Sequence, residues 1–144
     1  MSAWELRQRW NTLDARSFFR THFVIEGDPK VSILIPNKDH TEDLNKCVTS
    51  ILERSTWKNI QIIVIENNSE KEETFHYYEE LEKRYPQAKV VTWDGPFNYS
   101  AINNFGAKYA DGDYLLLLNN DTEVITPEWL ENMMAIARER MWAL

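Results

Sequence analysis

The sequence has few of the residues on which several common kinds of site depend. Cys47 is the only cysteine, so an internal disulfide and a metal site built on several cysteines are both excluded. The chain has only four glycines and contains neither G-x-G-x-x-G nor G-x-x-x-x-G-K-[ST], so the usual glycine cradles for a dinucleotide or a phosphate are absent. Its three histidines lie far apart and show no metal-ligand spacing.

Runs of basic residues and long apolar segments are also missing. The formal net charge is −7 and no Lys/Arg stripe is present, which counts against nucleic-acid binding through phosphates. No apolar run approaches the roughly 18 residues of a membrane span, and no charged-then-apolar leader begins the chain. We therefore expect a cytoplasmic chain, although a soluble piece of a larger membrane-associated protein would have the same pattern.

Strand and helix patterns alternate four times from Val31 onward. Short apolar runs, the first of them β-branched at three of its five positions, predict buried strands at 31–35, 60–65, 88–93 and 114–118. Apolar residues at helical spacing predict a helix after each of them, at about 41–55, 72–84, 98–110 and 127–138. This alternation is typical of an α/β domain with a mostly parallel sheet flanked by helices.

Polar residues predict where these helices begin. Asp39 or Thr41 is expected to cap the first helix, and Ser69 with Glu72 forms a capping-box pattern before the second. Thr126 and Pro127 are expected at the cap and first position of the last helix. In the first helix, Cys47 lies among apolar neighbours and is expected to be a buried thiol. Residues 1–30, rich in Trp and Phe, are expected to form a helical extension outside the repeat.

Each predicted strand is followed by a short polar stretch. These stretches are PNKD (36–39), ENNS (66–69), DGPFNYS (94–100) and NNDTE (119–123). Ligands of open α/β sheets bind outside the carboxyl ends of the strands, where all four stretches would gather. Taken singly, each is equally compatible with helix capping or an Asx turn, and that alternative stays open.

The NNDTE stretch has the chemistry of a hard-cation site. Mg²⁺ and Mn²⁺ prefer oxygen ligands, and Mg²⁺ commonly combines one or two carboxylates with phosphate oxygens and water. Asp121 supplies one carboxylate, and Asn119 can supply a neutral oxygen. One negative charge makes a weak site alone, so we expect metal binding mainly together with a nucleoside diphosphate.

The segments VSILIPNKD, IQIIVIENNS and FNYSAINNFGAKYADGDYLLLLNNDTEV resemble the inverting family 2 glycosyltransferases of GT-A (Rossmann-like) fold, most of all the bacterial, rhamnosyltransferase-like branch that builds surface polysaccharides. The resemblance spans roughly residues 31–138. It implies a nucleotide-sugar-binding domain over 31–144 and a divalent metal, Mg²⁺ or Mn²⁺. The residues it implies for the nucleotide are Pro36, Asn37, Asp39, Glu66, Asn67, Asn98, Ser100, Asn103 and Asn120; for the metal they are Asp121 and Asn119, at the position of the family's DxD motif.

Two departures from the family's pattern concern charge. Asn119 replaces the first acid of DxD, which weakens affinity for the metal, and Asn103 stands where many relatives have a basic residue. A third departure concerns extent, because the acceptor half and its base carboxylate follow the DxD strand in this family. We therefore assign no catalytic base and expect this chain to be the nucleotide-sugar half of a glycosyltransferase, inactive alone.

Alternative functions remain open from the sequence. A non-catalytic module that binds a nucleotide sugar or a partner would retain nucleotide affinity without turnover. A phosphoacceptor receiver domain is disfavoured, because it requires clustered acids and a lysine at a late strand end. Here the strand ends offer mainly amides, and no fifth strand carries a lysine. For the full enzyme the resemblance implies a glycan or lipid-linked acceptor and peripheral membrane association. An uncovered sheet edge would favour a homodimer.

Overall fold

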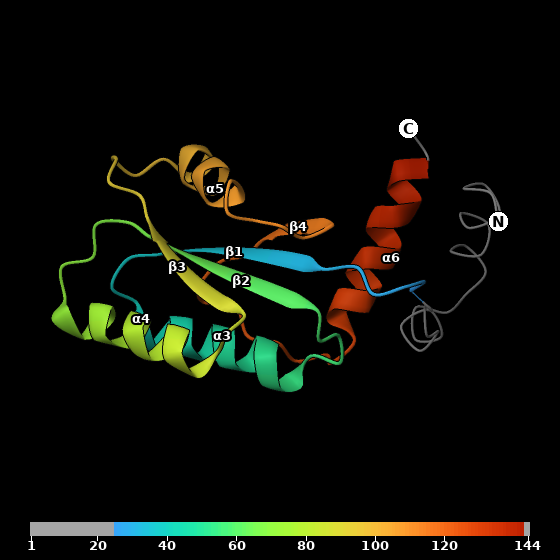
Figure 1. Cartoon of the computed structure of the whole chain (residues 1–144), viewed down its shortest axis with the longest axis horizontal. Coiled ribbons are helices and arrows are strands. Elements are labelled where there is room, and N and C mark those ends of the chain that lie inside the picture. Colours follow the sequence, from blue (N-terminus) through green and yellow to red (C-terminus); the bar gives the residue numbers. More distant parts are fainter. Residues whose placement is uncertain (1–24, 143–144) are drawn as a thin grey trace. The chain divides into compact units, whose positions relative to one another are not determined.

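The structure, a computed structural model, describes residues 25–142. All four predicted strands and all four predicted helices are present, and the strand limits agree with the prediction to within two residues. The predicted N-terminal extension lies mostly outside the described residues, and residues 25–30 form neither helix nor strand. The elements are β1 Val31–Asn37, α3 Thr41–Arg54, β2 Ile60–Glu66, α4 Glu72–Arg84, β3 Ala88–Thr92, α5 Tyr99–Ala107, β4 Tyr114–Leu117 and α6 Trp129–Trp142 (Figure 1).

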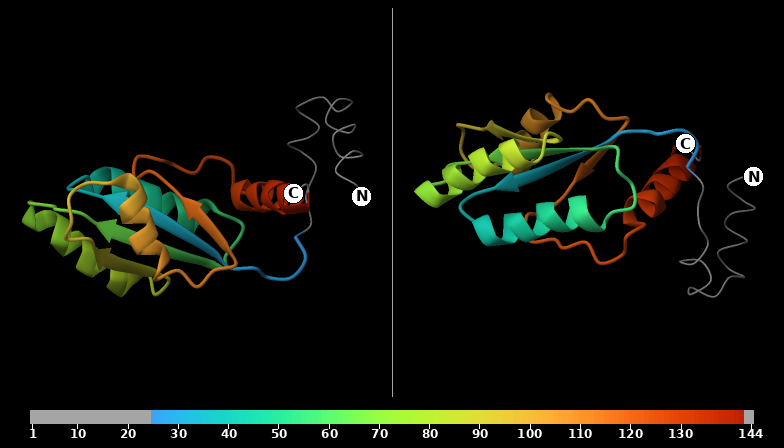
Figure 2. Two further views of the ribbon diagram at one scale, coloured as in Figure 1. Left: turned by 90° about the horizontal axis from the view of Figure 1, so that it is seen from above. Right: turned by 60° about the horizontal axis from the view of Figure 1, so that its bottom comes forward.

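The four strands form one parallel sheet in the order β3-β2-β1-β4. Residues 28–127 make a compact unit that contains the whole sheet, and α6 belongs to a second unit. Within the sheet unit, α3 and α4 cover one face and α5 covers the other (Figures 1 and 2). The predicted α/β architecture, a mostly parallel sheet flanked by helices, is therefore confirmed. Among residues 25–142, no helix has the length and apolar character needed to cross a membrane.

Three of the predicted helix starts are wrong in detail. Helix α3 has His40 at its N-cap without a side-chain cap, and α4 begins at Glu72 after an uncapped Lys71. Ser69 therefore forms no capping box. Helix α6 begins at Trp129, so Pro127 precedes it by two residues. The polar side chains expected to cap α3 and α4 are instead used in tertiary hydrogen bonds, described below.

The α5 face of the sheet packs closely around Gly106. Leu34, Ile65 and Ile102 are fully buried members of the hydrophobic cluster on this face. A Cβ added at Gly106 would lie 2.3 Å from Ile65 Cδ1 and 2.9 Å from Ile65 Cγ1. The absence of a side chain at 106 thus permits α5 to approach β2 directly.

We expect Gly106→Ala to destabilise the fold by about 1–3 kcal/mol, the range for overpacking a buried contact. Helix propensity alone would make alanine stabilising at this position, so a loss of stability would identify the steric clash. Urea denaturation measures the change. Ile65→Val removes the Cδ1 atom, so the penalty of Gly106→Ala should shrink in that background. An equal penalty in both backgrounds would contradict the packing argument.

Pro36 ends the pairing between the central strand β1 and its neighbour β4. Strands β1 and β4 are in register only from Val31↔Tyr114 to Leu34↔Leu117, whereas β1 pairs with β2 along its full length. The carbonyl of Leu34 accepts a hydrogen bond from Leu118 N, so Pro36, two residues later, faces the same side. Because proline has no N–H, the ladder stops there and the two chains diverge. Their divergence opens a gap at the carboxyl edge of the sheet.

Strand β4 is an edge strand with one incompletely covered face. Leu115 and Leu117 are 52% and 43% exposed, and they lie in register with Ser32 and Leu34 on the α5 side of the sheet. Helix α5 packs on β1 and β2. The expectation that all four strands would be buried on both faces is therefore wrong for β4.

Candidate functional site

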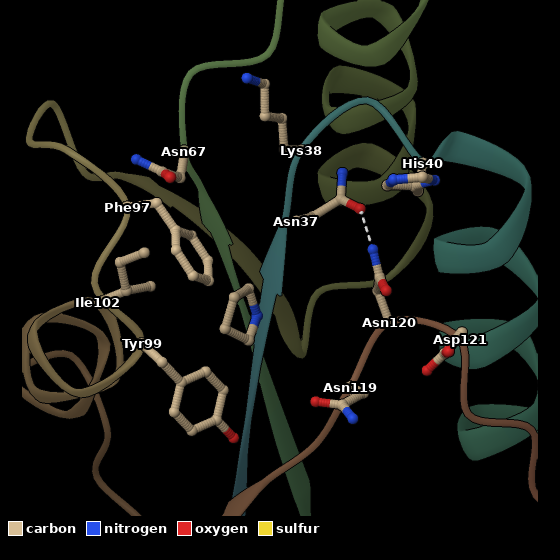
Figure 3. A pocket seen from close by; sticks show the side chains of 11 residues that line it. Asn37, Lys38, His40, Asn67, Phe97, Tyr99, Ile102, Asn119, Asn120 and Asp121 are labelled. Carbon is tan, nitrogen blue, oxygen red and sulfur yellow. Dashed lines mark hydrogen bonds between the residues drawn. The ribbon is translucent and has the colours of Figure 1, made fainter.

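A pocket lies at the carboxyl ends of β1 and β4. The connection leaving β1 runs to α3 on one face, and the connection entering β4 comes from α5 on the other, so the pocket lies where the strand order reverses. Such switch points are the usual ligand sites of open α/β sheets. The cavity has a volume of about 290 Å³ and is lined by Pro36, Asn37, Lys38, His40, Asn67, Phe97, Tyr99, Ile102, Asn119, Asn120 and Asp121 (Figure 3).

The pocket has one apolar wall and one polar wall. Phe97, Tyr99 and Ile102 come from the start of α5 and the loop before it, and they face the amide side chains at the ends of β1 and β4 (Figure 3). Phe97 is 75% exposed and Tyr99 is 45% exposed, so both rings are accessible to a ligand. Exposed rings beside converging polar groups suit a ligand with both a flat ring and a charged part.

The polar wall contains one uncompensated carboxylate. Asp121 is exposed and has neither a hydrogen bond nor an ion pair within the described residues. Behind it, the Cys47 thiol donates to the carbonyl oxygen of Asn119 at 3.8 Å. Cys47 is buried as predicted, and burial, followed by the charge of Asp121, raises the pKa of the thiol to about 12. The thiol is thus a neutral structural group at physiological pH.

Two basic residues at the pocket were not among the predicted site residues. Lys38 is exposed and forms no ion pair in the part of the chain that the structure describes. His40 Nδ1 lies 3.9 Å from Asp43 Oδ2, a loose contact between exposed side chains. Both belong to the loop that follows β1, so the position of PNKDH after a buried strand could have identified them. Phe97 and Tyr99 could likewise have been identified from their place beside Asn98 in PFNYS.

The structure brings together only some of the predicted residues. Those that line the pocket are Pro36, Asn37, Asn67, Asn119, Asn120 and Asp121. Those that do not line it are Asp39, Glu66, Asn98, Ser100 and Asn103. Apart from Ser100, which is exposed in the first turn of α5, each residue of the second group has hydrogen-bond partners within the protein.

Asp39 organises the polypeptide before α4. It has a positive φ of 57°, and its carboxylate accepts hydrogen bonds from Glu70 N at 3.0 Å, Lys71 N at 2.9 Å and Thr74 Oγ1 at 3.2 Å. The two backbone hydrogen bonds, that of Lys71 first, hold the pKa of Asp39 below its ordinary value. Asp39 therefore holds the residues just before α4 from a neighbouring loop, while the helix itself has no side-chain N-cap.

We expect Asp39→Asn to lower the melting temperature at pH 7. Because the folded-state pKa of Asp39 is lowered, its carboxylate stabilises the fold above the unfolded pKa of about 3.9, and this contribution disappears as pH falls through the folded pKa. The difference in melting temperature between variant and parent should therefore narrow below about pH 4. Thermal unfolding from pH 7 downward measures it, with the exposed Asp94→Asn as control. A difference independent of pH would contradict this role for the carboxylate.

Glu66 is buried behind the pocket. It is 2% exposed, and its oxygens accept from Ser69 N at 2.6 Å, Ser69 Oγ at 2.6 Å and Tyr78 Oη at 2.5 Å. Its side chain is therefore directed towards α4 and not into the cavity.

The two asparagines of α5 are also used within the protein. Asn98 is the N-cap of α5, and its Oδ1 accepts from Ala101 N at 3.0 Å. Asn103 donates through Nδ2 to the carbonyl of Tyr99 at 2.9 Å. Its Oδ1 is buried and has no partner within the described residues.

The residues of the pocket alone make an incomplete metal site. Within residues 25–142 no three His, Cys, Asp or Glu residues cluster in a way that could hold a metal ion. Asp121 supplies one carboxylate, and the amides of Asn119 and Asn120 supply neutral oxygens. This set fits a hard cation whose remaining ligands come from a diphosphate and water.

The chain matches known proteins over most of its length. Residues 32–141 match the family model described as glycosyl transferase family 2. The chain is 41% identical over 120 residues to the O-antigen biosynthesis protein RfbC of Myxococcus xanthus and 38% identical to the uncharacterized protein y4gI of Sinorhizobium fredii, each covering 83% of this chain. These regions make up only 9% and 13% of the two relatives.

A solved structure has a similar fold. The mannosyltransferase PcManGT from Pyrobaculum calidifontis, in complex with GDP-Man and Mn²⁺, superposes with a TM-score of 0.67 over 90% of this chain and 38% of that one. At 13% sequence identity, this likeness concerns the fold alone.

Proposed function

This chain belongs to glycosyl transferase family 2, and from that premise we propose that it binds a nucleoside-diphosphate sugar with a divalent metal for transfer of the sugar to a glycan or lipid-linked acceptor. The proposed binding domain spans residues 31–144. The GT-A fold expected from the sequence is confirmed by the structural neighbour. Because the chain spans only a small part of its curated relatives, the reaction of the whole protein belongs to the proposal.

The observation that carries the proposal is the division of the pocket into two walls. Exposed aromatic rings stand on one side, and the free carboxylate of Asp121 stands with two amides on the other. A nucleotide sugar has the matching division, since its base is flat and its diphosphate is anionic and binds cations. Phe97 and Tyr99 would contact the ring, and Asp121 with Asn119 would hold the metal.

Lys38 would provide positive charge on the protein side, with the imidazole of His40 beside it. The basic residue expected from the family's pattern is replaced by Asn103, which does not line the pocket. Lys38 is exposed, lines the pocket and has no competing ion pair within the described residues, so it is available to a phosphate. A bound divalent cation would stabilise the negative charge that grows on the departing nucleoside diphosphate.

The remaining predicted nucleotide residues divide into two proposed roles. Pro36, Asn37, Asn67 and Asn120 would contact or closely surround the ligand. Asp39, Glu66, Asn98 and Asn103 would hold the loops and α5 in place, because each of them already forms a hydrogen bond within the protein. Ser100, exposed at the start of α5, would reach a ligand only if that ligand extends beyond the pocket.

The direct experiment is calorimetric titration of the purified chain with UDP, dTDP and GDP, each with and without Mn²⁺. We expect one nucleotide to bind, with clearly higher affinity when Mn²⁺ is present. If the nucleotide bound with the same affinity with and without Mn²⁺, the proposal of a metal site would be wrong. Absence of binding to all three would contradict a nucleotide site in this chain.

A further inference from the structure

A chain of hydrogen bonds connects buried Glu66 to Asn120 in the pocket. The end of β2 meets the end of β1 in the register pair Asn37↔Glu66, so both side chains project to the α4 face of the sheet. There Tyr78 of α4 joins them, with its hydroxyl 2.5 Å from Glu66 Oε2 and 2.9 Å from Asn37 Nδ2. Asn37 Oδ1 in turn lies 2.8 Å from Asn120 Nδ2 (Figure 3).

Glu66 determines which group donates and which accepts in every hydrogen bond of this series. A carboxylate oxygen only accepts, so the Tyr78 hydroxyl donates its proton to Glu66. The Ser69 hydroxyl does the same, because it already accepts a hydrogen bond from Asp39 N at 3.0 Å. Burial, with the adjacent Glu66 charge, raises the pKa of Tyr78, so its hydroxyl keeps that proton.

The same reasoning assigns the donor and acceptor atoms of Asn37 and Asn120 at the pocket. The oxygen of Tyr78 is left as an acceptor, so Asn37 must present Nδ2 to it and Oδ1 to β4. Asn120 must then present Nδ2 to Asn37. Its Oδ1 is left as the free end of the amide, next to Asp121 in the chain, and it has no hydrogen bond within the described residues.

We propose that Glu66 and Tyr78 are positioning residues that act through Asn37 to hold the Asn120 amide with its oxygen, and not its NH₂ group, available to a cation in the pocket. This inference rests on the proposed function for the identity of the cation. The reversed amide would place two N–H donors beside the metal, and hard cations reject them in favour of oxygen ligands. Asn120 alone carries no information about which way its amide turns.

Glu66→Gln tests the direction with almost no change in shape. Ser69 N still requires an acceptor, so the new amide nitrogen takes the place of Oε2 and donates to Tyr78. The Tyr78 hydroxyl then donates to Asn37, the Asn37 amide turns over, and Asn120 follows. We expect the affinity for the bound nucleoside diphosphate in the presence of Mn²⁺ to fall about tenfold, the lower end of the effect of orienting residues behind metal ligands.

A double-mutant cycle measured by thermal unfolding tests the same series of hydrogen bonds, from Glu66 through Tyr78 and Asn37 to Asn120, without any ligand. Asn120→Asp places a carboxylate against Asn37 Oδ1, so it should lower the melting temperature by about 3 °C. In the Glu66→Gln background Asn37 presents its NH₂ group instead, so the same substitution should have little effect. Residues 66 and 120 share no direct hydrogen bond, and this coupling would not arise from a general packing role of Glu66.

Tyr78→Phe supplies the matched control. Without the hydroxyl the series of hydrogen bonds is interrupted, so Asn120→Asp should change the melting temperature equally with Glu or Gln at position 66. If the melting-temperature changes caused by Glu66→Gln and Asn120→Asp simply added when Tyr78 is present, the proposed coupling through hydrogen bonds would be wrong. If the melting-temperature effects of the two substitutions were coupled but Glu66→Gln left the Mn²⁺-dependent affinity unchanged, the hydrogen bonds would not serve to orient a ligand for the cation. Failure of the proposed function itself would be separately visible, as absence of nucleotide binding in the unsubstituted chain.

Discussion

Asp121→Ala is expected to remove the dependence of nucleotide affinity on Mn²⁺, with a loss on the order of a hundredfold in the presence of the metal, or about 2.7 kcal/mol. Asp121 is the only carboxylate that lines the pocket, and it has no partner of its own within the described residues. Its full charge is therefore available to a divalent cation, and the neighbouring amides cannot replace it. Without metal, the substitution should leave nucleotide affinity unchanged or slightly improved, because a repulsive charge near the diphosphate is gone.

The control for Asp121→Ala must remove a charge at the same end of the sheet. Asp94 follows β3, is exposed, and does not line the pocket. Asp94→Ala should preserve both the affinity and its response to Mn²⁺ in the same titrations. If Asp121→Ala retained the full Mn²⁺ response, the metal would be held elsewhere or not at all.

Replacing the aromatic wall should weaken nucleotide binding whether or not metal is present. Stacking of a base on an aromatic side chain contributes about 1–3 kcal/mol, so Phe97→Ala and Tyr99→Ala should each lower the affinity about tenfold. Both rings are substantially exposed, so their loss should have little effect on the melting temperature. The independence from Mn²⁺ separates this effect from that of Asp121.

Two variants sharpen the test of the aromatic wall. Tyr99→Phe keeps the ring and should keep the affinity, which distinguishes stacking from a hydrogen bond of the hydroxyl. Tyr109→Ala removes a ring that is 40% exposed and lies off the pocket, so it should not affect binding. Undiminished affinity in both Phe97→Ala and Tyr99→Ala would show that the base does not bind at this wall.

The candidate site could be located from the sequence but its parts could not all be assigned. In a parallel sheet the carboxyl ends of all strands meet at one edge, so the polar stretches after β1 and β4 had to come together once the strands were recognised. Asn37, Asn119 and Asp121 accordingly line the pocket. Phe97 and Tyr99 were missed, because their place beside Asn98 indicates this edge of the sheet but not whether the two rings will be covered by other residues.

The sequence by itself determined the alternation of strands and helices and the edge of the sheet at which a ligand can bind, because apolar periodicity and strand polarity are local properties of the chain. Only the tertiary structure decided which polar side chains line the pocket there. Asp39 and Ser69 bond to each other's loops and not to the helices next to them in sequence, and Glu66 bonds to Tyr78 on α4. A buried polar atom must find a partner wherever the fold brings one within reach, and that distance exists only once the strands lie side by side.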